Sequence, residues 1–276
     1  MTEASKESME RRIQWESVSQ EGEFDFHRNN VWRQTDSFVS HTADLFRYFG
    51  YSSGEFNGKV VLDVGAGSRL RTRYFEGAKI VALEPLAERF MQEIAWCDLG
   101  SAWQVYSSPA EKYIAELEGL VDFAVSINVI DHVFDPVSIL SNIRRYLKPD
   151  GKFLLSVDLH SEEEADHMHP VHLDVPILHD MVVEAGFEIV GAYTGLPNSE
   201  NYGHGVAYTL ILAPQEARTR LSDDREHADR LLAPRFFYDG QPHIPLNAIQ
   251  LHYRDVVSRK VATSEYAFEQ VSCCIC

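Results

Sequence analysis

Two adjacent side chains near the middle of the chain are well suited to proton transfer. Asp131 and His132 directly follow the apolar run 121–127 and its exit. An imidazole beside a carboxylate can take a proton from a hydroxyl group, which is general-base chemistry. Alternatively, His132 is a helix-start residue that packs under the sheet. The first interpretation makes Asp131 and His132 candidate catalytic residues.

A second group of polar side chains lies after the apolar run 152–158. It consists of Asp158, His160, His167, His169 and His172. Carboxylate and imidazole can act as general bases or bind divalent metals. We expect His160 to act as a base and the other three histidines to contact a substrate, and we assign no metal ligand. A His-rich surface loop is the alternative.

Tyr202 and His204 occupy a stretch rich in Gly and Asn, residues 195–205. They are further candidates for substrate contact, since loops beyond strand ends hold ligands in open α/β sheets. A solvent-exposed loop is the alternative.

A glycine-containing turn indicates a nucleoside pocket. The apolar run 59–64 contains Asp63 and leads into Gly65, Ala66 and Gly67. Glycines let the backbone approach a ligand closely. Glu84 ends the next apolar run, where its carboxylate can accept hydrogen bonds from ribose hydroxyls.

The same turn disfavours a nicotinamide dinucleotide. That cofactor is typically bound by the pattern G-x-G-x-x-G, and Leu70 stands at the position of the last glycine. No constellation for hydride transfer is evident either. An oxidoreductase is therefore the weaker interpretation.

The elements that must position these residues alternate between strand and helix. Continuous apolar strands imply a parallel sheet buried on both faces. Strands are expected at 59–64, 79–83, 103–106, 121–127, 152–158, 187–193 and 206–212. Helices are expected at 69–76, 86–97, 109–118, 136–146 and 176–185.

The chain is expected to have three parts. Residues 1–58 form an N-terminal helical segment in which Phe26, His27, Trp32 and Arg33 are candidates for a lid. Residues 59–214 form the nucleoside-binding domain. Residues 215–276 form a C-terminal extension with a helix at 215–232 and a frayed tail.

Five linked features resemble class I S-adenosylmethionine (SAM) methyltransferases over residues 59–212. They are the D-x-G-x-G turn, the acid Glu84 with Pro85 and Leu86, the segment 107–111, the strand exit 128–133 and the turn 147–152. The resemblance implies an α/β fold: a seven-stranded, mostly parallel, doubly wound sheet with helices on both faces, plus the N-terminal helical segment and C-terminal extension.

The resemblance also implies roles for individual residues. The turn would back the methionine and ribose parts of SAM, Glu84 would hold the ribose hydroxyls, and Ala110 would donate its N–H to adenine. Asn128 and Val129 would line the methionine end. The expected cofactor-binding set is Asp63, Gly65, Ala66, Gly67, Arg69, Glu84, Pro85, Leu86, Ser108, Ala110, Glu111, Asn128 and Val129.

Two positions depart from the family pattern. Arg69 stands where a third glycine is common, and Pro109 stands where an acid often reads adenine. Glu111 is a candidate to replace that acid. Arg69 is a candidate partner for the SAM carboxylate, helped by the positive end of a helix; a solvated or surface-paired arginine is the alternative.

Composition excludes several partners. The formal net charge of −17 repels nucleic acids and anionic membranes. No apolar run reaches the roughly 18 residues of a membrane span. Three of the four cysteines lie in the last four residues, where they cannot cross-link a core, and this fits a reducing cytoplasm.

The sequence therefore predicts a SAM-dependent methyltransferase that leaves S-adenosylhomocysteine (SAH) and modifies a small-molecule acceptor at a hydroxyl group, in a sugar, a nucleotide-sugar or another metabolite. The alternatives are a metal-assisted O-methyltransferase and a catalytically inactive SAM-binding regulator. The sequence leaves a homo-oligomer open.

Overall fold

The structure of the protein is a computed structural model that describes residues 12–159, 170–194, 206–215, 235–238 and 241–245. Several sequence-predicted features lie outside these ranges. They are His160, His167, His169, Tyr202, His204 and, apart from Gln215, the helix expected at 215–232.

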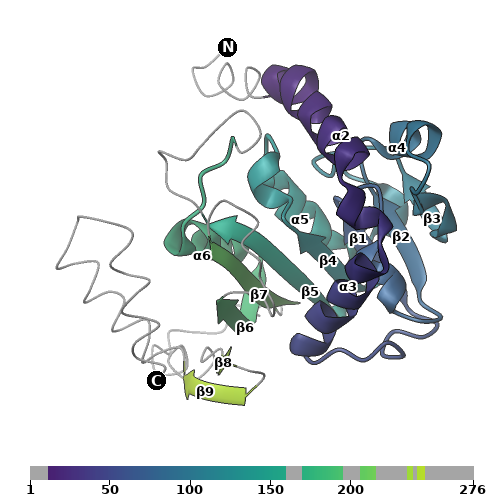
Figure 1. The fold of residues 1–276 in the computed structure, drawn as a ribbon. Coiled ribbons are helices and arrows are strands. Elements are labelled where there is room, and N and C mark those ends of the chain that lie inside the picture. Colours follow the sequence, from purple (N-terminus) through teal and green to yellow (C-terminus); the bar gives the residue numbers. More distant parts are fainter. Residues whose placement is uncertain (1–11, 160–169, 195–205, 216–234, 239–240, 246–276) are drawn as a thin grey trace, which may run out of the picture.

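The described strands form one sheet with the order β3-β2-β1-β4-β5-β7-β6-β8-β9 (Figure 1). Strands β1 to β5 run parallel, β7 is antiparallel to both β5 and β6, and β8 is parallel to β6. The strands are β1 (Val60–Val64), β2 (Lys79–Leu83), β3 (Gln104–Tyr106), β4 (Val121–Ile127), β5 (Leu147–Leu159), β6 (Phe187–Thr194), β7 (Val206–Pro214), β8 (Arg235–Tyr238) and β9 (Gln241–Pro245).

The seven predicted strands are confirmed as β1 to β7. Two further short strands, β8 and β9, extend the sheet beyond β6 and were not expected. Strand β5 also begins earlier than expected: Val121 pairs with Leu147 but Phe123 pairs with Lys152. The expected turn at 149–151 is therefore a bulge within β5, which keeps the strand paired with β4 on both sides of it.

Helices pack on both faces of the sheet (Figure 1). The α-helices are α2 (Gln20–Asn29), α3 (Asp36–Tyr48), α4 (Ala87–Glu93), α5 (Pro136–Tyr146) and α6 (Val175–Glu184). Short helical turns are η1 (Trp15–Ser19), η2 (Val31–Gln34), η3 (Arg71–Tyr74), η4 (Leu99–Ser101), η5 (Ala115–Leu117) and η6 (Ile130–His132).

Helices α5 and α6 begin at the residues that the sequence signals. Asp135 and Asp174 each accept a hydrogen bond from a backbone N–H in the first turn of the helix that follows. Each helix also has proline in its first turn, where the missing N–H has no helical partner to lose. The predicted ranges 136–146 and 176–185 match these helices closely.

Two predicted helices are much shorter in the structure. Only the 3-10 turn η3 lies within 69–76, and only η5 lies within 109–118. In both segments the backbone is tied to side chains elsewhere in the chain. Leu70 donates its N–H to Asp98, and Ile114 donates its N–H to Tyr146 Oη.

Alternate strand residues face opposite layers. Val61, Phe123 and Leu154 pack with Leu45 and Phe46 of α3 on one face. Leu62, Val64, Ala124 and Phe153 pack with residues of α5 and α6 on the other. This two-sided burial confirms the doubly wound architecture predicted from the apolar strands.

Helix α2 packs over α4, beside the carboxyl ends of the first strands. Phe24 stacks on Phe90 with ring centroids 6.0 Å apart. Arg89 lies over the Phe24 ring and makes two hydrogen bonds to Glu21, at 2.6 and 3.0 Å. The N-terminal segment is thus packed on the domain that follows it.

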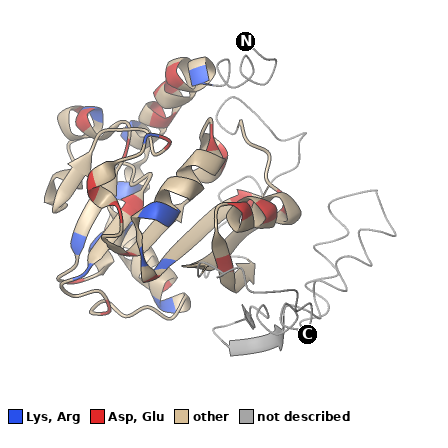
Figure 2. Cartoon of the chain, turned by 180° about the vertical axis from the view of Figure 1, so that it is seen from behind, with Lys and Arg blue, Asp and Glu red and all other residues tan. Residues whose placement is uncertain are grey.

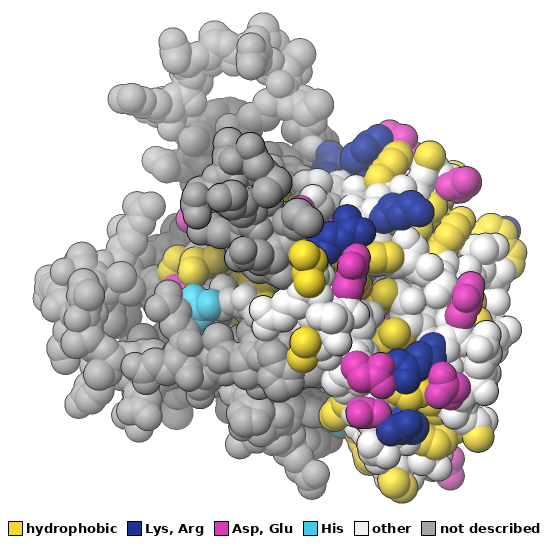
Figure 3. All heavy atoms as spheres, turned by 90° about the horizontal axis from the view of Figure 1, so that it is seen from above, with side chains coloured by type: hydrophobic (Ala, Val, Ile, Leu, Met, Phe, Trp, Pro, Cys, Tyr) yellow, Lys and Arg dark blue, Asp and Glu magenta, His cyan; other side chains and the backbone are white. Residues whose placement is uncertain are grey.

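The described surface carries both signs of charge, and Figure 2 shows them scattered over the helices and loops. On the face seen in Figure 3, the hydrophobic side chains lie singly or in small groups between polar ones. Within the described residues, no helix has the length and hydrophobicity that a membrane span requires.

Candidate active site

The candidate site lies where the strand order reverses, between β1 and β4. Open α/β sheets bind ligands at this point, beyond the carboxyl ends of the strands. Gly65 and Gly67 follow β1 with φ of 66° and 62°, and Asn128 follows β4 with φ of 56°. Among the described residues, Asn128 is the single non-glycine with positive φ, a strain typical of functional sites.

A cavity of about 590 Å³ opens at this point, a size suited to a small-molecule ligand. Nine residues of the predicted cofactor set line it: Gly65, Gly67, Glu84, Pro85, Leu86, Ala110, Glu111, Asn128 and Val129. His132 and Asp158 also line it. The N-terminal segment contributes Trp15, Gln20, Glu23, Phe26, His27, Asn30, Trp32, Arg33, His41 and Leu45.

Both glycines of the turn are in close contact with other parts of the site. A Cβ at Gly65 would lie 2.6 Å from Val129 Cγ1, and a Cβ at Gly67 would overlap the His27 ring. Gly67 therefore allows α2 to press against the turn. The sequence pattern identifies both glycines as part of the turn. It does not reveal that the packing of His27 leaves no room for a side chain at Gly67.

The closeness of this contact leads to a first prediction. Gly67→Ala should weaken SAH binding by at least about tenfold, or about 1.4 kcal/mol, because the new methyl group displaces His27 and α2 from the turn. Isothermal titration calorimetry with SAH measures the effect.

Gly58→Ala is the matched control, since Gly58 has a similar φ of 75° but open space around its Cβ position. It should share the backbone strain and keep SAH affinity. Equal affinities of the two variants for SAH would contradict the proposed steric role of Gly67.

Glu84 is buried at the end of β2 with its carboxylate aimed at the turn. Its Oε2 accepts the Gly67 N–H at 2.9 Å, and its Oε1 accepts the Leu86 N–H at 3.0 Å. Burial raises the pKa of Glu84 to about 7, against the opposing effect of these hydrogen bonds. The carboxylate is thus held rigidly, and each oxygen has a further lone pair for a ligand hydroxyl.

Three other residues of the predicted cofactor set lie behind the lining. Asp63 is buried and accepts a hydrogen bond from Thr72 Oγ1 at 2.7 Å, which anchors η3 to β1. Burial raises the pKa of Asp63 to about 6. Ala66 packs in the core near α4, and Ser108 Oγ donates to the Pro109 carbonyl. These three residues therefore lie outside the lining of the cavity.

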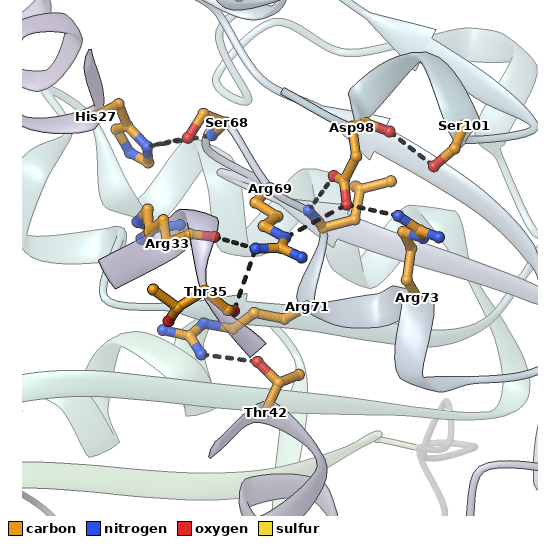
Figure 4. Close-up of polar contacts among 11 residues, drawn as sticks. His27, Arg33, Thr35, Thr42, Ser68, Arg69, Arg71, Arg73, Asp98 and Ser101 are labelled. Atoms are coloured by element: carbon orange, nitrogen blue, oxygen red, sulfur yellow. Dashed lines mark hydrogen bonds and ion pairs between the residues drawn. The ribbon is translucent and has the colours of Figure 1, made fainter. Parts of the chain in front are cut away.

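Arg69 also lies outside the lining, because it is held by other groups (Figure 4). Its guanidinium donates to the carbonyls of Arg33 and Thr35 and lies 3.8 Å from Asp98. The sequence prediction for Arg69 as a partner of the SAM carboxylate therefore lacks support from this geometry.

Arg33 and Arg71 line the cavity instead. Their guanidinium carbons lie 5.5 and 4.8 Å from the centroid of the Phe38 ring, and Arg71 donates to Thr42 Oγ1 at 3.2 Å (Figure 4). These contacts hold two cations at one wall of the cavity.

The wall of the cavity at Ala110 is held in place by α5 and by the residues just before it. Asn142 Nδ2 donates to the carbonyls of Ala110 and Glu111 at 2.9 and 3.0 Å. Glu111 Oε1 accepts the Phe134 N–H at 3.3 Å, and burial raises the pKa of Glu111 to about 7. This arrangement is compatible with Glu111 acting in place of the acid missing at Pro109.

His132 lies between two carboxylates. Its Nδ1 is 2.9 Å from Glu23 Oε1, and its Nε2 is 3.6 Å from Asp131 Oδ2. Burial on its own lowers the pKa of His132, but Asp131, Glu23 and Asp158 outweigh it and raise the pKa to about 9. The imidazole is therefore strongly basic.

Asp131 is fully buried, and neither of its carboxylate oxygens has a hydrogen-bond partner among the described residues. A buried carboxylate without hydrogen bonds is costly, and the neighbouring imidazolium offsets part of that cost. Asp131 does not line the cavity, whereas His132 does. His132 therefore faces the cavity, and Asp131 lies behind it.

The remaining predicted contacts are only partly described. His172 is half-buried and follows Val171, whose N–H donates to the Asp131 carbonyl. His160, His167, His169, Tyr202 and His204 lie outside the described residues. Within the described ranges, no group of three or more His, Cys, Asp and Glu side chains is arranged to hold a metal ion.

Sequence reasoning missed Glu23, His41 and Trp15. Glu23 and His27 are one helical turn apart on α2. Their i, i+4 spacing on an amphipathic segment could have indicated that both side chains face the same site. Trp15 donates its Nε1–H to the His132 carbonyl at 2.9 Å, a contact that only the tertiary fold creates.

The chain is similar to known methyltransferases. A family model described as a methyltransferase domain matches residues 32–190, more than half of the chain. Ubiquinone biosynthesis O-methyltransferase of Pseudomonas paraeruginosa (strain DSM 24068 / PA7) is 30% identical over 105 residues, which are 36% of this chain and 44% of that protein. The same-named protein of Xanthomonas oryzae pv. oryzae (strain PXO99A) is 34% identical over 103 residues, which are 36% and 43% of the two chains.

The matched region thus spans less than half the length of these curated relatives. A solved Burkholderia thailandensis 1,6-didemethyltoxoflavin-N1-methyltransferase is 21% identical, with a TM-score of 0.47 over 78% of this chain and 91% of that one. The family match covers β1 to β5 and the glycine turn, the parts that carry the sequence resemblance. The chain belongs to the methyltransferase domain family, as its resemblance to class I SAM-dependent methyltransferases predicted.

Proposed function

We propose that this protein transfers a methyl group from SAM to a hydroxyl group of a small molecule, with His132 as the general base. One observation carries the proposal. A basic imidazole between two carboxylates lies in the same cavity as the glycine turn and Glu84. Relatives named O-methyltransferases favour oxygen as the acceptor atom.

The cofactor would lie along the carboxyl ends of β1, β2 and β4. Glu84 accepts hydrogen bonds from the ribose hydroxyls, and Ala110 donates its N–H to adenine. The two cations Arg33 and Arg71 attract the methionine carboxylate. Asn128 and Val129 support the methionine end beside Gly65.

In the reaction, the acceptor oxygen attacks the methyl carbon in line with the departing sulfur. The C–O bond forms as the C–S bond breaks, sulfur keeps the electron pair, and SAH leaves as a neutral thioether. Neutral His132 takes the hydroxyl proton. Placing the two reactants in one cavity supplies much of the acceleration, up to roughly 7–11 kcal/mol in well-oriented systems.

An acceptor panel tests the proposed reaction. The purified protein is incubated with SAM labelled in its methyl group and with a phenol, an aniline and a thiophenol, which differ only in the heteroatom on the ring, together with a catechol and a hexose. Mass spectrometry should find the label on oxygen. Methylation of nitrogen or sulfur alone would overturn the choice of acceptor atom.

The acceptor panel, together with calorimetric titration of SAH, separates the alternatives. Loss of methylation with a chelator, restored by a divalent metal, would indicate the metal-assisted reaction. SAH binding without methylation of any acceptor would favour a regulatory SAM-binding protein.

A further inference from the structure

Helix α2 touches both halves of the site through two side chains one turn apart. His27 contacts the glycine turn, where the Ser68 N–H donates to His27 Nδ1 at 3.2 Å and Ser68 Oγ lies 2.9 Å from the same nitrogen (Figure 4). Glu23 contacts His132 at 2.9 Å. A single rigid turn of helix therefore spans the distance from the cofactor turn to the candidate base.

The tautomer of His27 follows from its contact with the backbone. Because the Ser68 N–H donates to Nδ1, this nitrogen is an acceptor and the ring proton is on Nε2. Burial, with the nearby cations Arg33 and Arg71, lowers the pKa of His27 to about 3. His27 therefore stays neutral, with its Nε2 3.9 Å from Glu23 Oε2.

Glu23 is thereby placed between two imidazoles of different charge. One carboxylate oxygen faces neutral His27, and the other pairs with His132. Although burial opposes ionisation, the pKa of Glu23 is lowered by its hydrogen bond to His132 and by the charges of His132 and Arg33. Glu23 is thus ionised when it faces His132.

We propose that Glu23 is a positioning residue for His132 and that α2 connects the base to the cofactor site. Because α2 packs on the glycine turn, the contact of Glu23 with His132 depends on the correct packing of that turn. This inference rests on the proposed role of His132. Glu23 would fix the plane of the imidazole and stabilise the imidazolium that forms when the acceptor loses its proton. The same ion pair would be lost if α2 left the turn.

The titratable groups that face His132 in the described structure come from three elements. Glu23 and neutral His27 lie on α2, Asp131 on η6 and Asp158 on β5. Removing the Glu23 charge leaves Asp131 and Asp158, so the imidazole should remain basic but less so. An opposite charge at this distance moves a pKa by roughly one to three units.

The test is a titration of His132 by NMR in SAH-bound protein with labelled histidine, the resonance being assigned by its absence in His132→Asn. The pKa in the wild type should be near 9. Glu23→Gln should lower it by about one unit, and Glu23→Asp should restore part of the shift. An unchanged His132 titration in Glu23→Gln would overturn the proposal.

Glu21→Gln is the matched control, because Glu21 lies on the same helix and pairs with Arg89 at the surface. It makes the same charge change without touching His132 and should leave the titration unchanged. A shift equal to that of Glu23→Gln would show a general charge effect and contradict the role of Glu23.

The link to the cofactor turn has its own control pair. Gly67→Ala, which displaces His27, should lower the pKa of His132 as Glu23→Gln does, whereas Gly58→Ala should not. If Gly67→Ala leaves the pKa of His132 unchanged, the proposed coupling through α2 is wrong.

Failure of the proposed function has a different signature. Methyl transfer that survives in His132→Asn would remove His132 as the base, even if Glu23→Gln moves its pKa. An altered pKa without any change in the pH profile of turnover would likewise count against the base. Thermal denaturation of each variant confirms that it is folded.

Discussion

Glu84→Gln should weaken SAH binding by about 10- to 100-fold, since hydrogen bonds to a charged group contribute roughly 1.5–3 kcal/mol. The substitution keeps the shape of the side chain but removes the charge that faces the ribose hydroxyls. The new amide must also satisfy the Gly67 and Leu86 N–H groups, which now donate to the carboxylate. Calorimetric titration with SAH measures the loss.

The pH dependence of the wild type gives a second check on Glu84. Its pKa is near 7 in the unliganded protein because the side chain is buried. Ribose hydroxyls favour the ionised form, so SAH affinity should fall as the pH drops below about 7 and level off above it. Glu84→Gln should lack this dependence.

Glu88→Gln is the control for both measurements, because Glu88 is exposed in the first turn of α4. It makes the same chemical change close to the site and should preserve affinity. Wild-type affinity in Glu84→Gln would contradict the ribose assignment.

The ionisation of Glu84 affects the stability of the fold in the opposite direction from its effect on SAH binding. A carboxylate whose pKa is higher in the folded protein than in the unfolded chain binds more protons when folded. Its contribution to stability is therefore full below the unfolded value of about 4.5 and is lost as the pH rises towards 7. Glu84 thus costs stability in its ionised form, which is the form that ligand binding uses.

His132→Asn should reduce the turnover of methyl transfer by about 10²- to 10⁴-fold, the usual contribution of a general base. Asparagine can place an amide nitrogen near the position of Nδ1 and so keep a donor facing Glu23. SAH affinity should change little, since the loss concerns the acceptor proton. Steady-state rates with the acceptor found in the panel measure the effect.

The pH profile identifies the base more specifically. The imidazole must be neutral to accept a proton, so kcat/KM in the wild type should rise with pH towards about 9. His132→Asn should remove this rise. His179→Gln is a suitable control, because His179 bonds to Tyr208 away from the cavity and glutamine can replace its Nε2. A rise that persists in His132→Asn would assign the titration to another group.

Local patterns in the sequence were sufficient for the central fold. Helix α5 was predicted at its observed bounds, and the structure shows why they are sharp: Asp135 caps its first turn and Pro136 begins it. Strands β1 and β4 are mostly apolar because both faces of the sheet are covered. The turn between Val64 and Ser68 was readable because glycine is favoured at positive φ.

The arginine and carboxylate contacts could not be predicted in the same way. The sequence alone does not distinguish Arg69 from Arg71 as the arginine that lines the cavity. In the structure, Asp98 and the carbonyl of Arg33 bind Arg69 and hold it away from the cavity. Glu23 is far from His132 in sequence, and only the docking of α2 brings them together. Strands β8 and β9 lack a clear alternating pattern. The pairing of β8 with β6, and of β9 with β8, depends on the edge that the sheet offers.

The structure of the protein bound to SAH is the most direct test of the central claim. The account predicts the ribose hydroxyls on Glu84, the methionine carboxylate beside Arg33 and Arg71, and the sulfur open to the side of the cavity where His132 lies. SAH bound outside this cavity, or with its sulfur turned away from His132, would contradict it.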